Sequence, residues 1–191
     1  MRFYLACILF LLGSPVSACK LALALAVDIS GSVDPEEYAI QMEGLASGLT
    51  DPTIGEALVQ SEARILLVQW TGASRQEVSI GWTKIGSFED LEVLATNIRD
   101  TPRAWRNFST AIGEALRFTG QRFSEVSECE RLVIDLSGDG VSNEGADPRE
   151  IQIDMRSLGI TVNALVIEGE DKDLTGYFWE NVITYLRKSV P

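Results

Sequence analysis

The chain has 191 residues, of which 46% are hydrophobic and 23% are charged, an ordinary balance for one globular domain with a sizeable core. Its 28 acidic and 16 basic residues give a formal net charge of −12, which argues against nucleic acid or an anionic membrane surface as a partner. Histidine is absent from the sequence, which excludes Ser-His-Asp catalysis, Cys-His catalysis and histidine-ligated zinc.

The first 18 residues have the pattern of a secretory signal peptide. Arg2 supplies a positive start, residues 3–12 form an apolar run too short to span a bilayer, and residues 16–18 place small side chains where signal peptidase needs them. We therefore expect a mature protein that begins near Cys19 and is secreted across the inner membrane, to the periplasm or the cell exterior. No later stretch is long and apolar enough for a transmembrane helix.

Two roles are open to Cys19. Residues 16–19 resemble a bacterial lipobox, which would make Cys19 the site of a lipid anchor. Alternatively, Cys19 and Cys129 each precede a buried strand, and parallel neighbouring strands would bring the two backbones to about 5 Å, within reach of a disulfide. The oxidising compartment that a secretion signal implies favours the disulfide.

Strands and helices alternate along the rest of the chain. In order, we expect a buried strand at 21–27, a helix from Asp34 to about Leu49, strands at 65–70 and 76–82 joined by a short turn, a helix from Ser87 to Ile98, a helix at 110–120, a strand at 132–136, a helix from Asp147 to Gly159, a strand at 160–167 and a helix at 174–188. This alternation predicts one α/β domain over residues 19–191: a three-layer, doubly wound and mainly parallel sheet with helices on both faces and one antiparallel edge strand.

Carboxylate and hydroxyl groups cluster directly after the first strand. Asp28, Ser30 and Ser32 offer hard oxygen ligands, which suit Mg2+, Mn2+ or Ca2+. Asp139 follows the strand at 132–136, and ligand sites of doubly wound sheets collect at the carboxyl ends of such strands. By itself the Asp-x-Ser-x-Ser pattern is weak evidence, since aspartate and serine also cap the helices that follow strands.

Two further motifs give the chain a resemblance to the von Willebrand factor A (vWA) family. Residues 110–116 are similar to the family's Thr-x-Thr-Gly-x-Ala-Leu, with Ile112 in place of the second threonine, and residues 133–140 resemble its strand that ends in Asp-Gly. Residues 133–140 and the hairpin that contains Trp70 more narrowly resemble an uncharacterised bacterial group, DUF1194. Measured against this pattern, the chain is short at its C-terminal edge, because it ends soon after Leu186.

The resemblance implies a metal-ion-dependent adhesion site with one divalent cation. Mg2+ is the first candidate, with Mn2+ and Ca2+ as alternatives. Asp28 would lie close to the cation, directly or through water, and Ser30 and Ser32 would bind it by their hydroxyls. Thr110 would bind directly or through water, and Asp139 mainly through water. One coordination position would stay open for a carboxylate from a protein partner.

Ser109 is an alternative to Thr110, but the spacing to the following Gly-x-Ala-Leu favours Thr110. The resemblance thus implies a secreted, metal-dependent protein-binding module, an adhesion or scaffold domain, and not an enzyme. The alternatives are a structural domain whose site holds no cation and a metal-dependent hydrolase. A haloacid-dehalogenase type of phosphatase would need a second acid at the position of Ser30.

Overall fold

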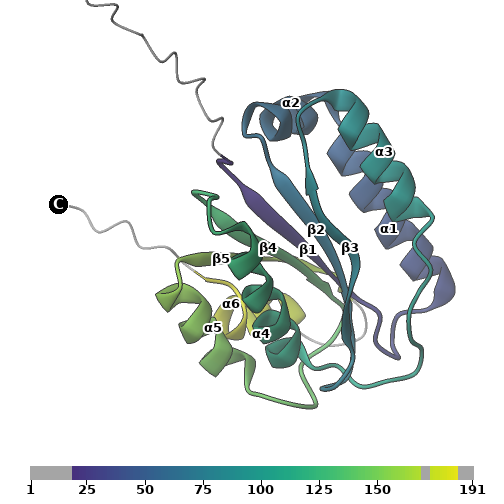
Figure 1. Ribbon diagram of the computed structural model, residues 1–191. Helices are drawn as coiled ribbons and strands as arrows, with labels where there is room; N and C mark the ends of the chain where they lie inside the picture. Colours follow the sequence, from purple (N-terminus) through teal and green to yellow (C-terminus); the bar gives the residue numbers. More distant parts are fainter. Residues whose placement is uncertain (1–18, 169–172, 185–191) are drawn as a thin grey trace, which may run out of the picture.

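Five strands form one sheet in the computed structural model, which describes residues 19–168 and 173–184 (Figure 1). The strand order is β3-β2-β1-β4-β5, and every neighbouring pair is parallel except β2 with β3. The strands are β1 (Ala22–Asp28), β2 (Arg64–Trp70), β3 (Gln76–Lys84), β4 (Leu132–Gly138) and β5 (Ile160–Val166). The mainly parallel sheet with one antiparallel edge strand is therefore confirmed.

Helices cover both faces of this sheet, so the expected three layers are present (Figure 1). One face carries α1 (Pro35–Thr50), α2 (Pro52–Gln60) and α3 (Phe88–Arg99), and the other carries α4 (Ile112–Arg122), α5 (Pro148–Ser157) and α6 (Leu174–Asn181). A short 3-10 turn, Phe123–Val126, follows α4. Because β1 lies at the centre, with helices on both sides, nearly all of it is apolar.

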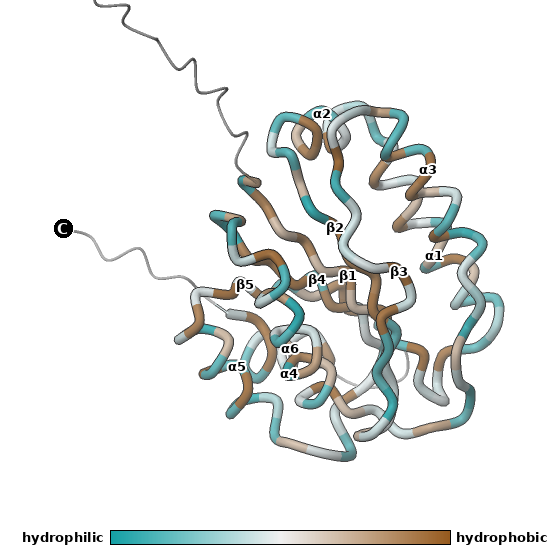
Figure 2. The backbone as a smooth tube through the Cα atoms, in the orientation of Figure 1, coloured by the Kyte–Doolittle hydropathy of each residue, from teal (hydrophilic) through white to brown (hydrophobic). Residues whose placement is uncertain are grey.

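The alternation of side chains along β1 divides the core in two. Ala22, Ala24 and Ala26 face the helices α4 to α6, whereas Leu25 and Val27 face α1 to α3. Figure 2 shows hydrophobic residues along the central strands and polar residues over much of the helical surface. Asp28 ends this apolar strand and is itself completely buried.

Helix α2 is absent from the sequence-based expectation, although its start carries a clear signal. The carboxylate of Asp51 accepts hydrogen bonds from the amides of Thr53 and Ile54, and Pro52 occupies the first helical position. Only Gly55 and Leu58 are buried in its nine residues. So short a helix has too little buried face to produce a recognisable periodicity.

The expected helix at 174–188 is wrong in its length, since α6 ends at Asn181. The chain then turns to the outer edge of β5, where the Thr184 amide donates to the Val162 carbonyl at 3.1 Å and the Val162 amide donates to the Thr184 hydroxyl at 2.7 Å. The β-branched residues at 182–184 favour this extended edge over a further helical turn. The remainder of the expected helix lies outside the described residues, as does the predicted signal peptide at 1–18.

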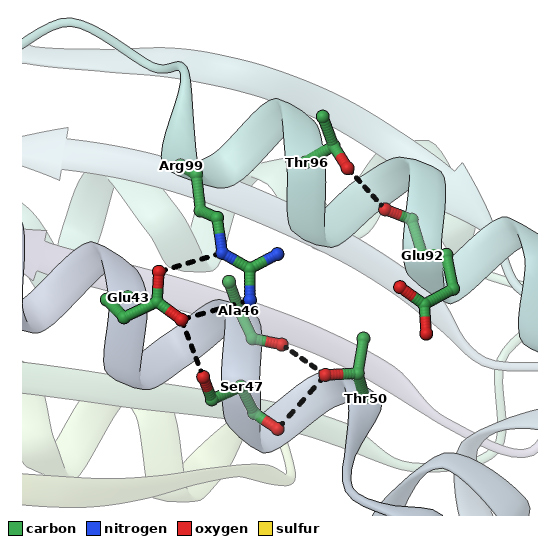
Figure 3. A network of polar contacts seen from close by, with 7 residues as sticks. All are labelled: Glu43, Ala46, Ser47, Thr50, Glu92, Thr96 and Arg99. Carbon is green, nitrogen blue, oxygen red and sulfur yellow. Dashed lines mark hydrogen bonds and ion pairs between the residues drawn. The ribbon is translucent and has the colours of Figure 1, made fainter.

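Polar side chains join α1 to α3 at the surface (Figure 3). The Arg99 guanidinium donates to both carboxylate oxygens of Glu43, at 2.8 and 3.0 Å, and the Ser47 hydroxyl donates to the same carboxylate at 2.8 Å. These contacts lower the pKa of Glu43 to about 2, with the hydrogen bond from Arg99 as the largest cause.

Replacing Glu43 with glutamine should remove an acid-sensitive contribution to stability. The folded-state pKa lies below the ordinary 4.5, so this contribution is present above that pH and is lost as the pH falls towards about 2. The contribution to stability should be small, because solvent screens the exposed ion pair of Glu43 and Arg99. Urea unfolding across this pH range measures the effect as the difference between the wild type and Glu43→Gln, with the exposed Glu130→Gln, away from this network, as the control. Parallel pH profiles for the wild type and Glu43→Gln would contradict it.

A disulfide joins Cys19 to Cys129, with the two Cα atoms 4.5 Å apart. Cys19 lies just before β1 and Cys129 just before β4, and these strands are parallel neighbours as the disulfide prediction requires. The Glu130 amide also donates to the Cys19 carbonyl at 3.0 Å. Across the described ranges, no helix combines the length and the apolar character needed to cross a membrane.

Candidate metal site

The site lies where β1 and β4 end beside each other. Asp28 is the last residue of β1, and Asp139 comes directly after β4. The Asp28 amide donates to the Ser137 hydroxyl at 3.3 Å, and that hydroxyl donates to the Gln41 side-chain oxygen at 2.9 Å. These buried contacts hold the ends of both strands to α1. Neither Ser137 nor Gln41 is among the sequence-predicted site residues, although Gln41 is a polar residue on the buried side of its helix.

Hydrogen bonds link four of the five predicted site residues. The Ser30 amide donates to one oxygen of Asp28 at 2.7 Å, and the Ser30 and Ser32 hydroxyl oxygens lie 3.2 Å apart. The Ser32 hydroxyl donates to the Asp139 carboxylate at 2.7 Å. The loop after β1 and the loop after β4 therefore bring their carboxylates and hydroxyls into one group.

The Asp28 carboxylate is incompletely paired. Its Oδ2 atom is buried and has no hydrogen-bond partner among the described residues, and a β carbon at Gly138 would lie 3.6 Å from it and 2.9 Å from the Phe178 ring. The pKa of Asp28 is raised to about 7, mainly by burial and also by the nearby Asp139 charge, against the lowering effect of the hydrogen bonds from Ser30. An unpaired carboxylate oxygen is costly to bury, and a bound cation would offset that cost.

Thr110 is held by its main chain, and its hydrogen bonds in the described structure go to residues 142–144 and not to the other four predicted site residues. Its amide donates to the Asn143 side-chain oxygen at 3.0 Å, and its carbonyl accepts from the Asn143 amide at 2.9 Å, which ties it to the loop beyond Asp139. The preceding Phe108 carbonyl accepts from the Gly31 amide at 2.8 Å, which ties the same segment to the loop after β1. Thr110 is buried, and its segment thus contacts both other loops.

Ser109, the alternative to Thr110, is engaged elsewhere. Its hydroxyl donates to the Glu144 carboxylate, which also accepts from the Ala73 amide at 3.0 Å. The bond from Ser109 is the largest cause that lowers the pKa of Glu144, and the charge of Arg75 contributes as well. Glu144 therefore braces the β2–β3 turn against the segment that carries Thr110.

Gly113 allows α4 to approach the loop after Glu144. A β carbon at Gly113 would lie 2.3 Å from the Ala146 carbonyl oxygen, a main-chain atom that can move only with its loop. Gly113→Ala should therefore destabilise the protein by about 1–3 kcal/mol. Gly44→Ala in α1 is the matched control: nothing lies within 4 Å of its β carbon, and alanine there should stabilise by up to about 1 kcal/mol. Urea unfolding of the two variants should show opposite signs, and equal effects would refute this packing argument.

The donor set suits a hard divalent cation. Within the described ranges, no group of three or more Asp, Glu, Cys or His side chains is arranged to hold a metal ion. The candidate site has two carboxylates and completes its oxygen set with hydroxyls. Such an all-oxygen set matches the preferences of Mg2+, Mn2+ and Ca2+, and among the described residues no donor forms a hydrogen bond with the buried Oδ2 of Asp28.

Solved structures with a similar fold define the class of protein. The proximal thread matrix protein 1 of the mussel byssus superposes with a TM-score of 0.61 at 22% identity, over 78% of this chain and 38% of its own. A structure of the same mussel protein "with zinc occupied MIDAS motif" gives 0.63. A von Willebrand factor type A protein from Catenulispora acidiphila gives 0.62 at 16% identity over 86% of this chain and 37% of its own. The fold is therefore that of a vWA domain.

A third protein with a similar fold, the pilus adhesin SpaC of Lactobacillus rhamnosus GG, gives a TM-score of 0.58 at 15% identity over 81% of this chain. The present chain spans between 26% and 38% of these three proteins. Residues 18–187 match the family described as "Protein of unknown function (DUF1194)", so the chain belongs to that family. Among curated proteins, none matches the sequence.

Proposed function

We propose that this protein is a secreted vWA-type module that binds a protein partner through one divalent cation. The observation that carries the proposal is the buried, unpaired oxygen of Asp28 within a group of carboxylates and hydroxyls from separate loops. Hydrogen bonds between three segments far apart in the sequence support the proposal, namely the loop after β1, the segment that carries Thr110 and the loop after β4.

The residues that would hold the cation are Asp28, Ser30, Ser32, Thr110 and Asp139, and Mg2+ is the cation we propose. Mg2+ keeps several waters and is commonly held by one or two carboxylates, which matches this set. Because Asp139 would act mainly through water, at most one carboxylate would contact the ion directly, and the ion would stay electrophilic towards a further acid. We therefore propose that the partner offers a carboxylate to the cation.

Binding is favoured over catalysis for two reasons. The chain has no histidine to serve as a general base. The similar structures include a pilus adhesin and a byssus matrix protein, whose names describe attachment or a matrix and not a reaction. By analogy, these names favour a binding role for this chain.

Secretion is part of the proposal. A disulfide in the described region fits an oxidising compartment, and the predicted signal peptide would deliver the chain there. The sulfur of Cys19, once bonded to Cys129, has no valence left for a lipid thioether. We therefore propose a free periplasmic or extracellular protein in preference to one anchored at Cys19.

Calorimetric titration with Mg2+ and Mn2+ tests the proposal. We expect saturable one-to-one binding to the wild type, and Asp139→Ala should weaken it by about 10- to 100-fold, as the loss of a partner that acts through water does at other metal sites. Asp154→Ala, which removes an exposed carboxylate on α5, is the control for overall charge. No binding to the wild type would reject the cation and favour a structural role, and equal affinities for Asp139→Ala and wild type would remove Asp139 from the site.

A further inference from the structure

The main chain of the loop after β1 is held by an arginine from a distant segment. The Nη2 nitrogen of Arg103 donates to the Ile29 carbonyl at 2.9 Å and to the Ser30 carbonyl at 2.8 Å. These carbonyls belong to the residues that directly follow Asp28. We propose that Arg103 is a positioning residue, which fixes this loop in the conformation that presents Asp28, Ser30 and Ser32 to a divalent cation. The inference rests on the proposed function.

Arg103 is itself fixed from β2 and α1. The buried side chain of Gln69 donates to the Pro102 carbonyl at 2.9 Å and accepts from the Ala104 amide at 3.1 Å, so it clamps the residues on either side of Arg103. The Tyr38 hydroxyl donates to the Thr101 carbonyl at 2.9 Å. The main chain that carries Arg103 is therefore anchored. Because Arg103 cannot move freely with the loop after β1, its two hydrogen bonds restrain that loop.

The same segment continues to Thr110. Between Arg103 and Thr110, the Phe108 carbonyl accepts from the Gly31 amide, and the β carbon of an alanine at Gly31 would lie 3.4 Å from the Asn107 Cα. Arg103 thus binds two carbonyls of the loop after β1, and the Phe108 carbonyl binds an amide of the same loop. This double attachment sets the loop and the Thr110 segment in one arrangement.

Two roles of Arg103, its positive charge and its hydrogen bonds to the loop after β1, would affect cation binding in different ways. Within the described ranges no carboxylate forms an ion pair with Arg103, and its Nη2 bonds go to main-chain carbonyls. A positive charge close to a cation site would by itself repel the cation, so its removal would tighten binding. Loss of a residue that orients the ligands would weaken binding instead. The two roles predict opposite signs.

The test compares the Mn2+ affinities of Arg103→Met and Arg103→Lys. The control is Arg106→Met, because Arg106 is an exposed arginine of the same segment. Arg103→Met should raise the dissociation constant for Mn2+ by about 10- to 100-fold. Arg103→Lys, which keeps the charge and can donate, should fall between Arg103→Met and the wild type, and Arg106→Met should match the wild type. Affinity of Arg103→Met equal to or tighter than that of the wild type would overturn the inference.

A second readout needs no metal. Hydrogen–deuterium exchange of residues 29–33 in chelator should be faster in Arg103→Met than in the wild type, because the Ser30 and Val33 amides are bonded within the restrained loop and the Gly31 amide donates from it to the Phe108 carbonyl. Unchanged exchange would overturn the positioning role even if Mn2+ affinity fell. Absence of Mn2+ binding in the wild type would instead reject the proposed function and, with it, the cation part of the inference. The exchange data would then still decide whether Arg103 holds the loop.

Discussion

Replacing Asp28 with asparagine is expected to stabilise the metal-free protein and, at the same time, to abolish its stabilisation by Mg2+. In the wild type the side chain is completely buried, and only one of its carboxylate oxygens accepts a hydrogen bond in the described structure. A buried ion carries a desolvation penalty of several kcal/mol. Asparagine removes the charge but keeps the shape, and a new unsatisfied amide offsets part of the gain. The metal-free variant should therefore gain on the order of 1–3 kcal/mol.

Mg2+ should close or reverse the stability difference between the two proteins. At a free concentration about 100 times the dissociation constant, a ligand that binds only the folded state stabilises it by about 2.7 kcal/mol. The wild type should gain this amount, whereas Asp28→Asn should gain none. Urea unfolding at mildly alkaline pH, in chelator and in Mg2+, measures all four free energies.

The control for this experiment is Asp135→Asn. Asp135 lies in the middle of β4, is only partly buried and accepts a hydrogen bond from Asn163 at 2.8 Å, so its loss should leave the response to Mg2+ unchanged. If Asp28→Asn kept the full response to Mg2+, Asp28 could not be a ligand. If it were less stable than the wild type in chelator, the carboxylate would have a favourable partner that outweighs its burial.

The second large effect that we expect is the contribution of the disulfide to the free energy of unfolding. Its cysteines are separated by 110 positions, and in the chain-entropy model a cross-link across so long a loop stabilises by about 4–5 kcal/mol. The double variant Cys19→Ala/Cys129→Ala should lose about this much free energy of unfolding. Both cysteines lie in the core beside β1 and β4, so the loss also includes some packing.

A reductant separates the loss of the cross-link from the loss of packing. Urea unfolding of the wild type with and without reductant measures the cross-link alone, because the sulfurs remain in place. The double variant should unfold at the same urea concentration with and without reductant. Equal stability of the oxidised and reduced wild type would show that the cross-link contributes little. Rapid thiol labelling of both cysteines in the oxidised protein would show that the disulfide does not form.

The local sequence was sufficient for most of the fold. The apolar run that ends at Asp28 predicts a buried central strand, and the Asp34-Pro35 and Asp147-Pro148 pairs predict the starts of α1 and α5, as the structure confirms. The same Asp-Pro signal precedes α2, but that helix buries too few residues to show a period, so the sequence does not predict it. The predicted end of α6 is wrong because contact with the edge of β5 outweighs helical preference at Thr184.

By itself, the sequence determined the class of fold and the kinds of oxygen atoms that gather after β1 and β4, and it favoured a disulfide between Cys19 and Cys129 without excluding a lipid anchor; the structure contains the disulfide. Strand and helix periods, caps and ligand chemistry are properties of neighbouring residues, so a linear pattern can display them. Only the tertiary structure decided that Asp28 keeps one oxygen unpaired, that Thr110 is bound by its main chain and that Arg103 holds the Ile29 and Ser30 carbonyls. These contacts join residues far apart in the chain, often through main-chain atoms that every residue carries, and no sequence pattern marks which of those atoms will meet.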